Sequence, residues 1–290
     1  MSKPEPFKTF VVSLERAVER RAHMQKLLKK LGLEAQFIKA VDGAALTDAQ
    51  RARYDRAKAN LLYGSEMTGG EIACYLSHYQ IYEHIVASDI EVALILEDDI
   101  DCVEDLRAIV RELALQEDPQ WTVVRLQSAK VNVVTPDSAR AFGAPVAQVA
   151  GRTLCRLTTT VLGGCAYLIR REAAAVMLEF GRRIFLPIDH TLDRYWENGI
   201  VPFVIRPLPV WQNDALASAI GPRGSEVFGK AGTARKRARR AIDGFNKRAF
   251  HLAFEEPWLA RGLSAIGLQS ARLALASQAR RPALVDTAGR

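Results

Sequence analysis

The apolar segment Glu91–Leu96 (EVALIL) runs directly into three consecutive carboxylates, Glu97, Asp98 and Asp99, with Asp101 two residues further on. A short run of branched apolar residues is typical of a strand that is buried on both faces. Ligands of open α/β sheets bind at the carboxyl ends of the strands. Because adjacent carboxylates repel one another, a divalent cation with oxygen ligands would stabilise them there. The segment therefore predicts an α/β fold with a metal and ligand site at this strand end.

Two other interpretations of the acidic cluster stay open. The carboxylates could form a solvated turn, or they could cap the N-terminus of the helix that follows. A phosphoacceptor pocket of the receiver type also uses carboxylates at strand ends, but receiver domains are much shorter than 290 residues. If the strand continues through the cluster, alternation places Glu97 and Asp99 on one side and Asp98 on the other.

The rest of the pattern alternates between strands and helices. Lys8–Leu14 is short and β-branched, Arg16–Leu31 is amphipathic and ends at Gly32, and Ala35–Val41 is a second strand. Further helices are expected at Thr47–Leu62, Glu71–Ser88, Val103–Leu115 and Arg171–Phe180, and further strands at Trp121–Leu126, Leu157–Val161, Cys165–Arg170 and Phe203–Pro209. This βαβ opening predicts a mainly parallel central sheet with flanking helices.

The composition fits a globular chain with one basic segment. Hydrophobic residues make up 49% of the chain and charged residues 25%, and the net charge is +7. Eight basic residues and one acidic residue lie between Lys230 and Arg248, so this segment carries the whole excess. We therefore predict a main domain over residues 1–225 and a basic, Ala-rich helical segment over residues 226–290. The four cysteines lack metal-binding spacing, which favours free thiols in a reducing compartment.

The basic segment suggests a surface for an anionic partner. Apolar residues recur every three to four positions between Ala234 and Phe254. A basic amphipathic helix of this kind can lie on an anionic membrane, here through residues 230–254. Packing against the main domain is the alternative. Nucleic acid is not an expected partner, because aromatic interleaving and a known motif are missing. With no secretory signal, we expect a cytoplasmic protein, peripheral on the cytoplasmic face of the inner membrane.

Three ordered blocks resemble glycosyltransferase family 25, the bacterial lipopolysaccharide and lipooligosaccharide transferases and their relatives. The blocks are Val11–Arg21, Gly70–His78 and Leu94–Asp99, and Ala40–Gly43 is similar to the ending of the family's second strand. They cover roughly residues 8 to 105 in the family's order and spacing. The resemblance implies a GT-A type fold, a UDP-sugar donor, Mn²⁺ or Mg²⁺, and transfer with inversion, commonly of galactose. Ser13 stands where the family often has Asn, which removes no charged group.

The resemblance and the positions together suggest roles for individual residues. Asp99 and Glu97 are the expected metal ligands. The expected contacts of the nucleotide sugar are Ser13, Leu14, Arg16, Arg20, Asp42, Ser77, His78 and Asp98. The first three follow the first strand, where a nucleotide could rest on the strand-to-helix turn. Arg16 and Arg20 would meet phosphate charge. For His78 the alternative is a packed structural histidine beside Cys74 on one helix face.

An inverting transfer needs a base that takes the proton of the acceptor hydroxyl. Asp189 is the candidate, because it follows a short apolar segment and matches an acidic position of the family; Asp193 is the alternative. The predicted function is a metal-dependent inverting glycosyltransferase that moves galactose from UDP-galactose onto a lipopolysaccharide, a lipooligosaccharide or another glycan. The alternatives are UDP-glucose or another nucleotide sugar as donor, and a non-catalytic nucleotide-sugar-binding protein of the same fold.

Overall fold

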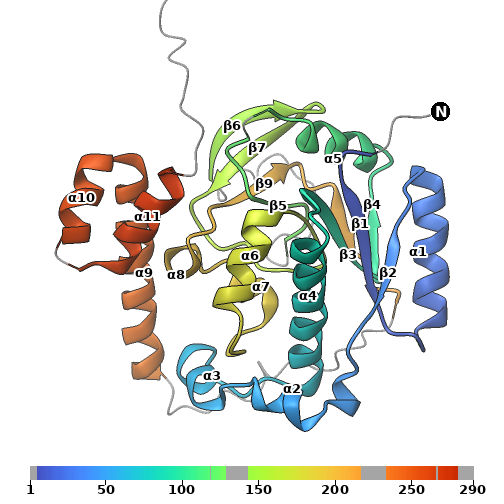
Figure 1. Ribbon diagram of the computed structural model, residues 1–290, viewed down its shortest axis with the longest axis horizontal. Coiled ribbons are helices and arrows are strands. Elements are labelled where there is room, and N and C mark those ends of the chain that lie inside the picture. The colour runs from blue at the N-terminus through green and yellow to red at the C-terminus, as the bar shows by residue number, and fades with distance from the viewer. Residues whose placement is uncertain (1–4, 118, 129–142, 217–232, 266, 280–290) are drawn as a thin grey trace, which may run out of the picture.

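The computed structural model describes residues 5–117, 119–128, 143–216, 233–265 and 267–279 (Figure 1). Its centre is an eight-stranded sheet in the order β2-β1-β3-β8-β5-β9-β7-β6. The strands are β1 Lys8–Ser13, β2 Gln36–Lys39, β3 Val92–Glu97, β5 Val123–Arg125, β6 Gly143–Val149, β7 Arg152–Leu157, β8 Ala166–Arg170 and β9 Pro202–Arg206. A separate two-stranded sheet pairs β4 Ile100–Cys102 with β10 Val210–Gln212 in antiparallel fashion.

Within the eight-stranded sheet, only β7 and β8 run against the common direction. β1 pairs in parallel with β2 and β3, and β5 pairs in parallel with β9. β8 lies antiparallel between β3 and β5, and β7 lies antiparallel between β9 and β6. The expected α/β fold, with a mainly parallel sheet and flanking helices, is confirmed. The two reversed strands are a feature that the βαβ opening did not predict.

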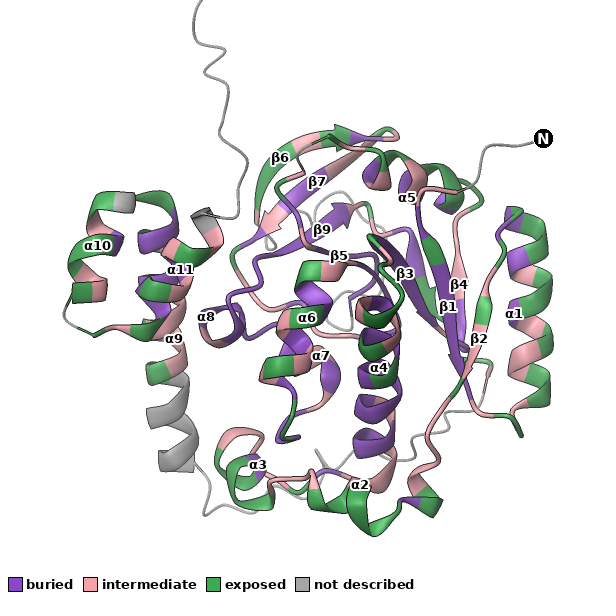
Figure 2. Ribbon diagram, viewed as in Figure 1, coloured by how far each residue is buried: buried purple, intermediate pink, exposed green. Residues whose placement is uncertain are grey.

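Two hydrophobic cores form on the two faces of the sheet, because side chains alternate along each strand. From β3, Leu94 and Leu96 pack with α1 Val18–Leu31 and α5 Leu106–Ala114. On the other face, Ala93 and Ile95 pack with α4 Gly69–Ala87 and α6 Arg171–Phe180. Figure 2 shows that α4 is buried along much of its length. The expected end of α1 is also present, since Gly32 adopts φ 64° and its N–H bonds to the last turn.

Two expected elements differ from the structure. The helix expected over Thr47–Leu62 is two helices, α2 Asp48–Ala52 and α3 Arg56–Leu62, because Asp55 caps α3 and accepts a hydrogen bond from the Lys58 N–H at 2.9 Å. The strand expected over Leu157–Val161 is wrong: β7 ends at Leu157. Further along, the N–H groups of Val161 and Leu162 donate to the Asp193 carboxylate and not to a neighbouring strand. The remaining short helices are η1 Gly43–Ala45, α7 Ile188–Leu192 and α8 Tyr195–Asn198.

Three helices follow the main sheet, namely α9 Thr233–Glu255, α10 Pro257–Ala265 and α11 Gln269–Ala279. Phe250 and Phe254 of α9 belong to the same buried core as Tyr195 and Trp196 of α8. The Tyr195 hydroxyl lies 2.8 Å from Nε2 of His251. These helices therefore pack on the main domain. The domain boundary that we predict near residue 225, and the basic side chains up to residue 240, lie outside what the structure describes. In the described residues, every helix is too short or too polar to cross a bilayer.

Candidate functional site

A cavity of about 270 Å³ opens at the carboxyl ends of β1, β2 and β3. Parallel strands bring these ends to one edge of the sheet, so residues far apart in the sequence meet there. Of the residues expected to hold the nucleotide sugar or the metal, the cavity is lined by Ser13, Leu14, Arg16, Arg20, Asp42, Ser77, Glu97, Asp98 and Asp99. We call this space the donor cavity. His78 is fully buried and lies outside its lining.

One wall of the donor cavity is a close contact between two backbone segments. A Cβ atom added to Gly43 would lie 2.7 Å from the backbone of Gly69 and Gly70, so η1 and the first turn of α4 meet without side chains between them. Ser77 fixes the same wall: its hydroxyl accepts from the Val41 N–H at 2.9 Å and donates to the Ala73 carbonyl at 2.8 Å. The Ser77 hydroxyl is thus already used by the backbone.

The start of α4 explains how its side chains reach the site. Thr68 and Glu71 form a capping box, in which the Thr68 hydroxyl accepts from the Glu71 N–H at 3.1 Å and the Glu71 carboxylate accepts from the Thr68 N–H at 2.7 Å. This fixed start places Cys74, Ser77 and His78 on the turns that follow, beside the end of β3.

Arg20 holds two of the three consecutive carboxylates. Its Nη2 atom donates to Asp98 Oδ1 at 2.9 Å and forms a second ion pair with Asp99 Oδ2. Ser13 adds a hydrogen bond from Oγ to Asp98 Oδ2 at 2.6 Å. The expected alternation of side chains between the two faces of the sheet stops at Glu97, because β3 ends there. Asp98 and Asp99 therefore both contact the Arg20 guanidinium. Arg20 lines the cavity as expected, but its first partners are carboxylates.

We call the carboxylates of Glu97, Asp98 and Asp99 the acidic corner. Within it, Asp99 has a strongly raised pKa. Burial, together with the nearby charge of Glu97, raises the pKa of Asp99 to about 6. Its Oδ2 atom accepts a hydrogen bond from Gln212 Nε2 at 3.1 Å. Its Oδ1 atom is buried and has no hydrogen-bond partner among the described residues. A buried carboxylate oxygen without a partner is costly, and a cation is one way to satisfy it.

A second cavity of about 90 Å³ adjoins the first. Cys74 and Glu97 line both cavities, so the two spaces meet at these side chains. Asp189, His190 and Gln212 line the second cavity only. We call it the Asp189 cavity. The residue expected to act as base therefore lines a cavity that adjoins the donor cavity at Cys74 and Glu97.

Asp189 and Asp193 have different surroundings. Asp189 accepts hydrogen bonds from the N–H groups of Gly163 at 2.8 Å and of His190 at 2.9 Å. Burial raises the pKa of Asp189, but nearby His190 and the backbone donors outweigh burial and lower it overall. Asp193 accepts from the N–H groups of Val161 and Leu162, both at 2.8 Å, and lies outside the lining of both cavities.

Arg16 and Asp42 face each other at the open side of the donor cavity. The two Nη atoms of Arg16 donate to the two carboxylate oxygens of Asp42, one of them at 3.1 Å. Asp42 Oδ1 also accepts from the Ala44 N–H at 3.0 Å. The exposed pair links the end of β1 to the end of β2, so a nucleotide in this cavity would meet both side chains.

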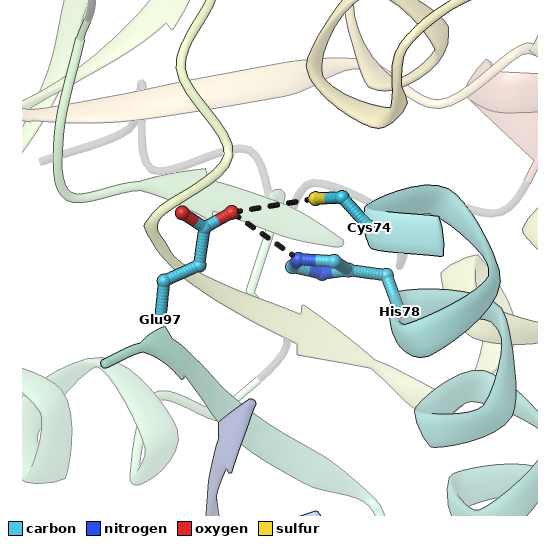
Figure 3. Close-up of side chains that lie close together, drawn as sticks. All are labelled: Cys74, His78 and Glu97. Carbon is cyan, nitrogen blue, oxygen red and sulfur yellow. Dashed lines mark hydrogen bonds and ion pairs between the residues drawn. The ribbon is translucent and has the colours of Figure 1, made fainter. Parts of the chain in front are cut away.

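Figure 3 shows Cys74 and His78 of α4 facing Glu97 at the end of β3. The Cys74 Sγ atom lies 3.6 Å from Glu97 Oε1, and His78 Nε2 lies 3.5 Å from the same oxygen. On its other side, the His78 ring is fixed by Tyr167, whose hydroxyl is 2.7 Å from Nδ1. The helical spacing placed Cys74 and His78 on one face, but it did not reveal that this face meets Glu97.

Sequence reasoning gave no role to several residues that shape the site. Gln212 contacts Asp99, and Arg125 lies buried 3.4 Å from Asp193 Oδ1. A charged residue inside the apolar stretch Trp121–Leu126 is a visible signal, since an arginine in a buried strand needs a buried carboxylate. Gly163 supplies a backbone donor, for which the sequence gives no side-chain signal.

The structure is thus an α/β protein whose acidic strand end lines two adjoining cavities. The chain belongs to glycosyltransferase family 25: the family model, described as an LPS biosynthesis protein, matches residues 7–192. The matched range contains the acidic residues Glu97, Asp98, Asp99 and Asp189, and almost all of the other residues that line the two cavities. The strand arrangement is compatible with the GT-A-like fold that the resemblance implies.

Similar proteins include family members that are named inactive and one whose name carries no such word. A mouse protein named inactive glycosyltransferase 25 family member 3 is 30% identical over 217 residues, covering 69% of this chain and 36% of that protein. Its human counterpart is 29% identical over 218 residues, covering 69% and 35%. A glycosyltransferase 25 family member of Aedes aegypti is 41% identical over 95 residues, covering 31% and 16%. The chain thus spans about a third of the length of the mammalian relatives it matches.

Proposed function

We propose that this chain is a metal-dependent inverting glycosyltransferase that transfers a sugar onto a lipopolysaccharide, a lipooligosaccharide or another glycan. The first candidate for the sugar is galactose, with UDP-galactose as the donor. The observation that carries the proposal is the meeting of the two cavities at Glu97. A donor whose diphosphate lies at the acidic corner would extend its sugar towards this junction. An acceptor hydroxyl in the Asp189 cavity would then face the anomeric carbon.

The acidic corner fits a hard divalent cation. Mn²⁺ and Mg²⁺ prefer oxygen ligands, and Asp99 Oδ1 is a buried carboxylate oxygen that needs a partner. Glu97 and Asp99 would hold the ion. When bound, such an ion neutralises charge on the departing nucleoside diphosphate. Arg20 would keep Asp98 in place and offer Nε, which has no hydrogen-bond partner among the described residues, towards phosphate oxygens.

Asp189 would accept the proton of the attacking hydroxyl. The lowered pKa of Asp189 means that the carboxylate is ionised near neutral pH and can accept a proton. The hydrogen bonds from Gly163 and His190 fix its orientation. The alternative base, Asp193, is already used by the Val161 and Leu162 N–H groups. The geometry therefore favours Asp189.

The decisive experiment measures donor binding and turnover separately. We expect UDP-galactose to raise the melting temperature only when Mn²⁺ is present, and UDP-glucose in the same screen compares the donors. Asp99→Ala should abolish both this shift and the Mn²⁺-dependent release of UDP. Glu179→Ala, which removes an exposed carboxylate from α6, is the matched control. Mn²⁺-dependent release that survives in Asp99→Ala would contradict the proposal.

A non-catalytic nucleotide-sugar-binding protein is the second candidate. The names of the mouse and human relatives, which describe them as inactive, favour it. In that case, UDP-galactose and Mn²⁺ would still raise the melting temperature, but neither hydrolysis nor transfer would exceed the rate of a sample without protein. The complete set Glu97, Asp98 and Asp99 supports the enzyme, because a protein without turnover has less need of adjacent repelling carboxylates.

We also propose that α9 attaches the protein to an anionic membrane, which would place it on the cytoplasmic face of the inner membrane. Ile242, Phe245 and Leu252 are exposed and share one side of α9 by helical spacing. Because Phe250 and Phe254 pack in the core, deletion of the helix would disturb the fold. The test is therefore Phe245→Ser with sedimentation on vesicles that contain acidic lipids. We expect weaker retention; retention equal to wild type would contradict the attachment.

A further inference from the structure

The three side chains in Figure 3 converge on one oxygen, Glu97 Oε1. One ligand atom each from Cys74, His78 and Glu97 lies within 4.8 Å of the others. Cys74 Sγ donates to Glu97 Oε1 at 3.6 Å, and His78 Nε2 lies 3.5 Å from the same oxygen, which is long for an N–H···O hydrogen bond. His78 Nε2 is fully buried and has no hydrogen-bond partner among the described residues. Buried polar atoms in folded proteins nearly always have a hydrogen-bond or metal partner, so an unpartnered buried Nε2 atom needs an explanation.

The two separations from Glu97 Oε1 match those between ligands of a tetrahedral ion, and the Cys74 and His78 ligand atoms lie within 4.8 Å of each other. Zinc bonds of about 2.0–2.3 Å at tetrahedral angles place ligand atoms about 3.3–3.7 Å apart. Both separations from Glu97 Oε1 fall within this range. Thiolate and imidazole also select zinc over Mn²⁺ and Mg²⁺, which prefer oxygen. The ligand set therefore differs in chemistry from the acidic corner around Asp99, although Glu97 belongs to both.

The surroundings of His78 are those of a metal ligand. Metal-bound histidines use the second ring nitrogen in a hydrogen bond that fixes the ring. Nδ1 of His78 lies 2.7 Å from the Tyr167 hydroxyl, which in turn lies 2.7 Å from the Tyr82 hydroxyl. In the tautomer that carries its proton on Nδ1, His78 donates to Tyr167 and the lone pair of Nε2 faces Glu97. Two lone pairs face to face repel each other, and a cation between them removes this repulsion.

We propose that Cys74, His78 and Glu97 form a three-ligand zinc site at the junction of the donor cavity and the Asp189 cavity. Because Cys74 and Glu97 line both cavities, a fourth position is open to a water molecule. On binding, the Cys74 S–H bond breaks, a sulfur–zinc bond forms, and the proton leaves to the solvent. Zinc would draw Glu97 away from the acidic corner, and it would therefore inhibit the Mn²⁺-dependent reaction proposed above.

Cobalt is a direct probe of this site, because a thiolate bound to Co²⁺ gives a near-ultraviolet charge-transfer band. We expect wild-type protein to bind one Co²⁺ with this band, and added Zn²⁺ to remove it. Cys74→Ser should lose the band. Cys102→Ser, which changes another half-buried free cysteine, should keep it. His78→Gln should weaken Zn²⁺ binding at least about tenfold, since even an outer partner of a zinc ligand contributes that much. A wild-type protein without the band, or a Cys74→Ser protein with it, overturns the proposal.

A second measurement needs no variant. Zn²⁺ should protect Cys74 from alkylation by a maleimide, with Cys102 in the same sample as the internal control, both followed by mass spectrometry. Equal labelling of Cys74 with and without Zn²⁺ contradicts the site. The zinc proposal and the transferase proposal fail separately: Asp99→Asn should lose the Mn²⁺-dependent effect of UDP-galactose but keep the thiolate–cobalt band.

Discussion

Ser13 Oγ donates a hydrogen bond of 2.6 Å to Asp98 Oδ2, across 85 positions of the chain. This bond joins the end of β1 to the residue directly after β3. Both residues are almost fully buried, so water does not replace either partner. Burial raises the pKa of Asp98, and the bond from Ser13 opposes that effect. Ser13 therefore helps to keep Asp98 ionised at the edge of the donor cavity.

Ser13→Ala should destabilise the protein by roughly 1–3 kcal/mol, because a buried carboxylate oxygen loses its donor. Urea unfolding at pH 8 measures this change. Ser88→Ala is the control, since the Ser88 hydroxyl is exposed and lies 3.4 Å from its His84 partner. A Ser13→Ala protein as stable as the Ser88→Ala protein would show that the Asp98 bond contributes nothing.

Asp99→Asn should stabilise the ion-free protein at pH 8, on the order of 1 kcal/mol. The pKa of Asp99 is raised from 3.8 to about 6 on folding, so the native state binds the proton more tightly than the unfolded chain does. Stability from this group is therefore present at low pH and is lost as the pH rises through about 6. Melting curves in EDTA from about pH 4 to pH 8 measure the difference, which should be small near pH 4, grow as the pH rises from 3.8 to about 6, and stay constant above that. A variant less stable than wild type at pH 8 would refute this sign.

Asp189→Asn should lower the turnover of the proposed reaction about 10²- to 10⁴-fold, because the amide cannot accept the hydroxyl proton. Binding of UDP-galactose should change little, since Asp189 lies outside the lining of the donor cavity. UDP release under saturating donor, beside a thermal-shift titration, separates the two effects. Normal turnover with normal donor binding removes Asp189 from the mechanism.

Asp193→Ala should act on stability instead, with a loss on the order of 3 kcal/mol. The change leaves two backbone N–H groups, of Val161 and Leu162, without their acceptor. It also leaves Arg125 buried without its carboxylate partner. Chemical denaturation measures the loss. A stable Asp193→Ala protein with no turnover would instead make Asp193 the base.

Gly43→Ala should weaken donor binding and lower the melting temperature, because the new Cβ would lie 2.7 Å from the backbone of Gly69 and Gly70. η1 and the start of α4 must move apart to accommodate it. Gly244→Ala in α9 is the matched control, since a Cβ there meets no atom within 4 Å and alanine favours a helix. Equal melting temperatures for the two variants would show that the contact is not required.

The parts of the fold and of the site that depend on a local sequence pattern were predictable from the sequence. The apolar run before Glu97 gave β3 and placed the acidic corner at its carboxyl end, and Gly32 marked the end of α1. The ordered blocks of family resemblance assigned Ser13, Asp42 and Asp99 to one site, and all three line the donor cavity. These features depend on sequence neighbours or on the parallel order of strands, both of which a single chain displays.

Long-range pairings were not predictable. β7 and β8 run against the other strands, and their direction depends on partners far away in the sequence. Beyond the end of β7, Asp193 accepts hydrogen bonds from the Val161 and Leu162 N–H groups, 32 and 31 positions earlier in the chain. The approach of Glu97 to Cys74 and His78 is equally non-local, because it requires α4 to cross the end of β3. Helical spacing shows which side chains share a face, but not what that face meets.

One carboxylate in the wall of two cavities couples whatever those cavities hold. The charge of a ligand on one side of Glu97 changes the potential felt on the other side, and such linkage is reciprocal by thermodynamic necessity. For the donor and acceptor proposed above, substitutions at Glu97 would shift both apparent affinities together, whereas substitutions at Asp42, which lines the donor cavity only, would shift that of the donor alone. A protein built this way cannot adjust its preference for one substrate at that position without altering its response to the other.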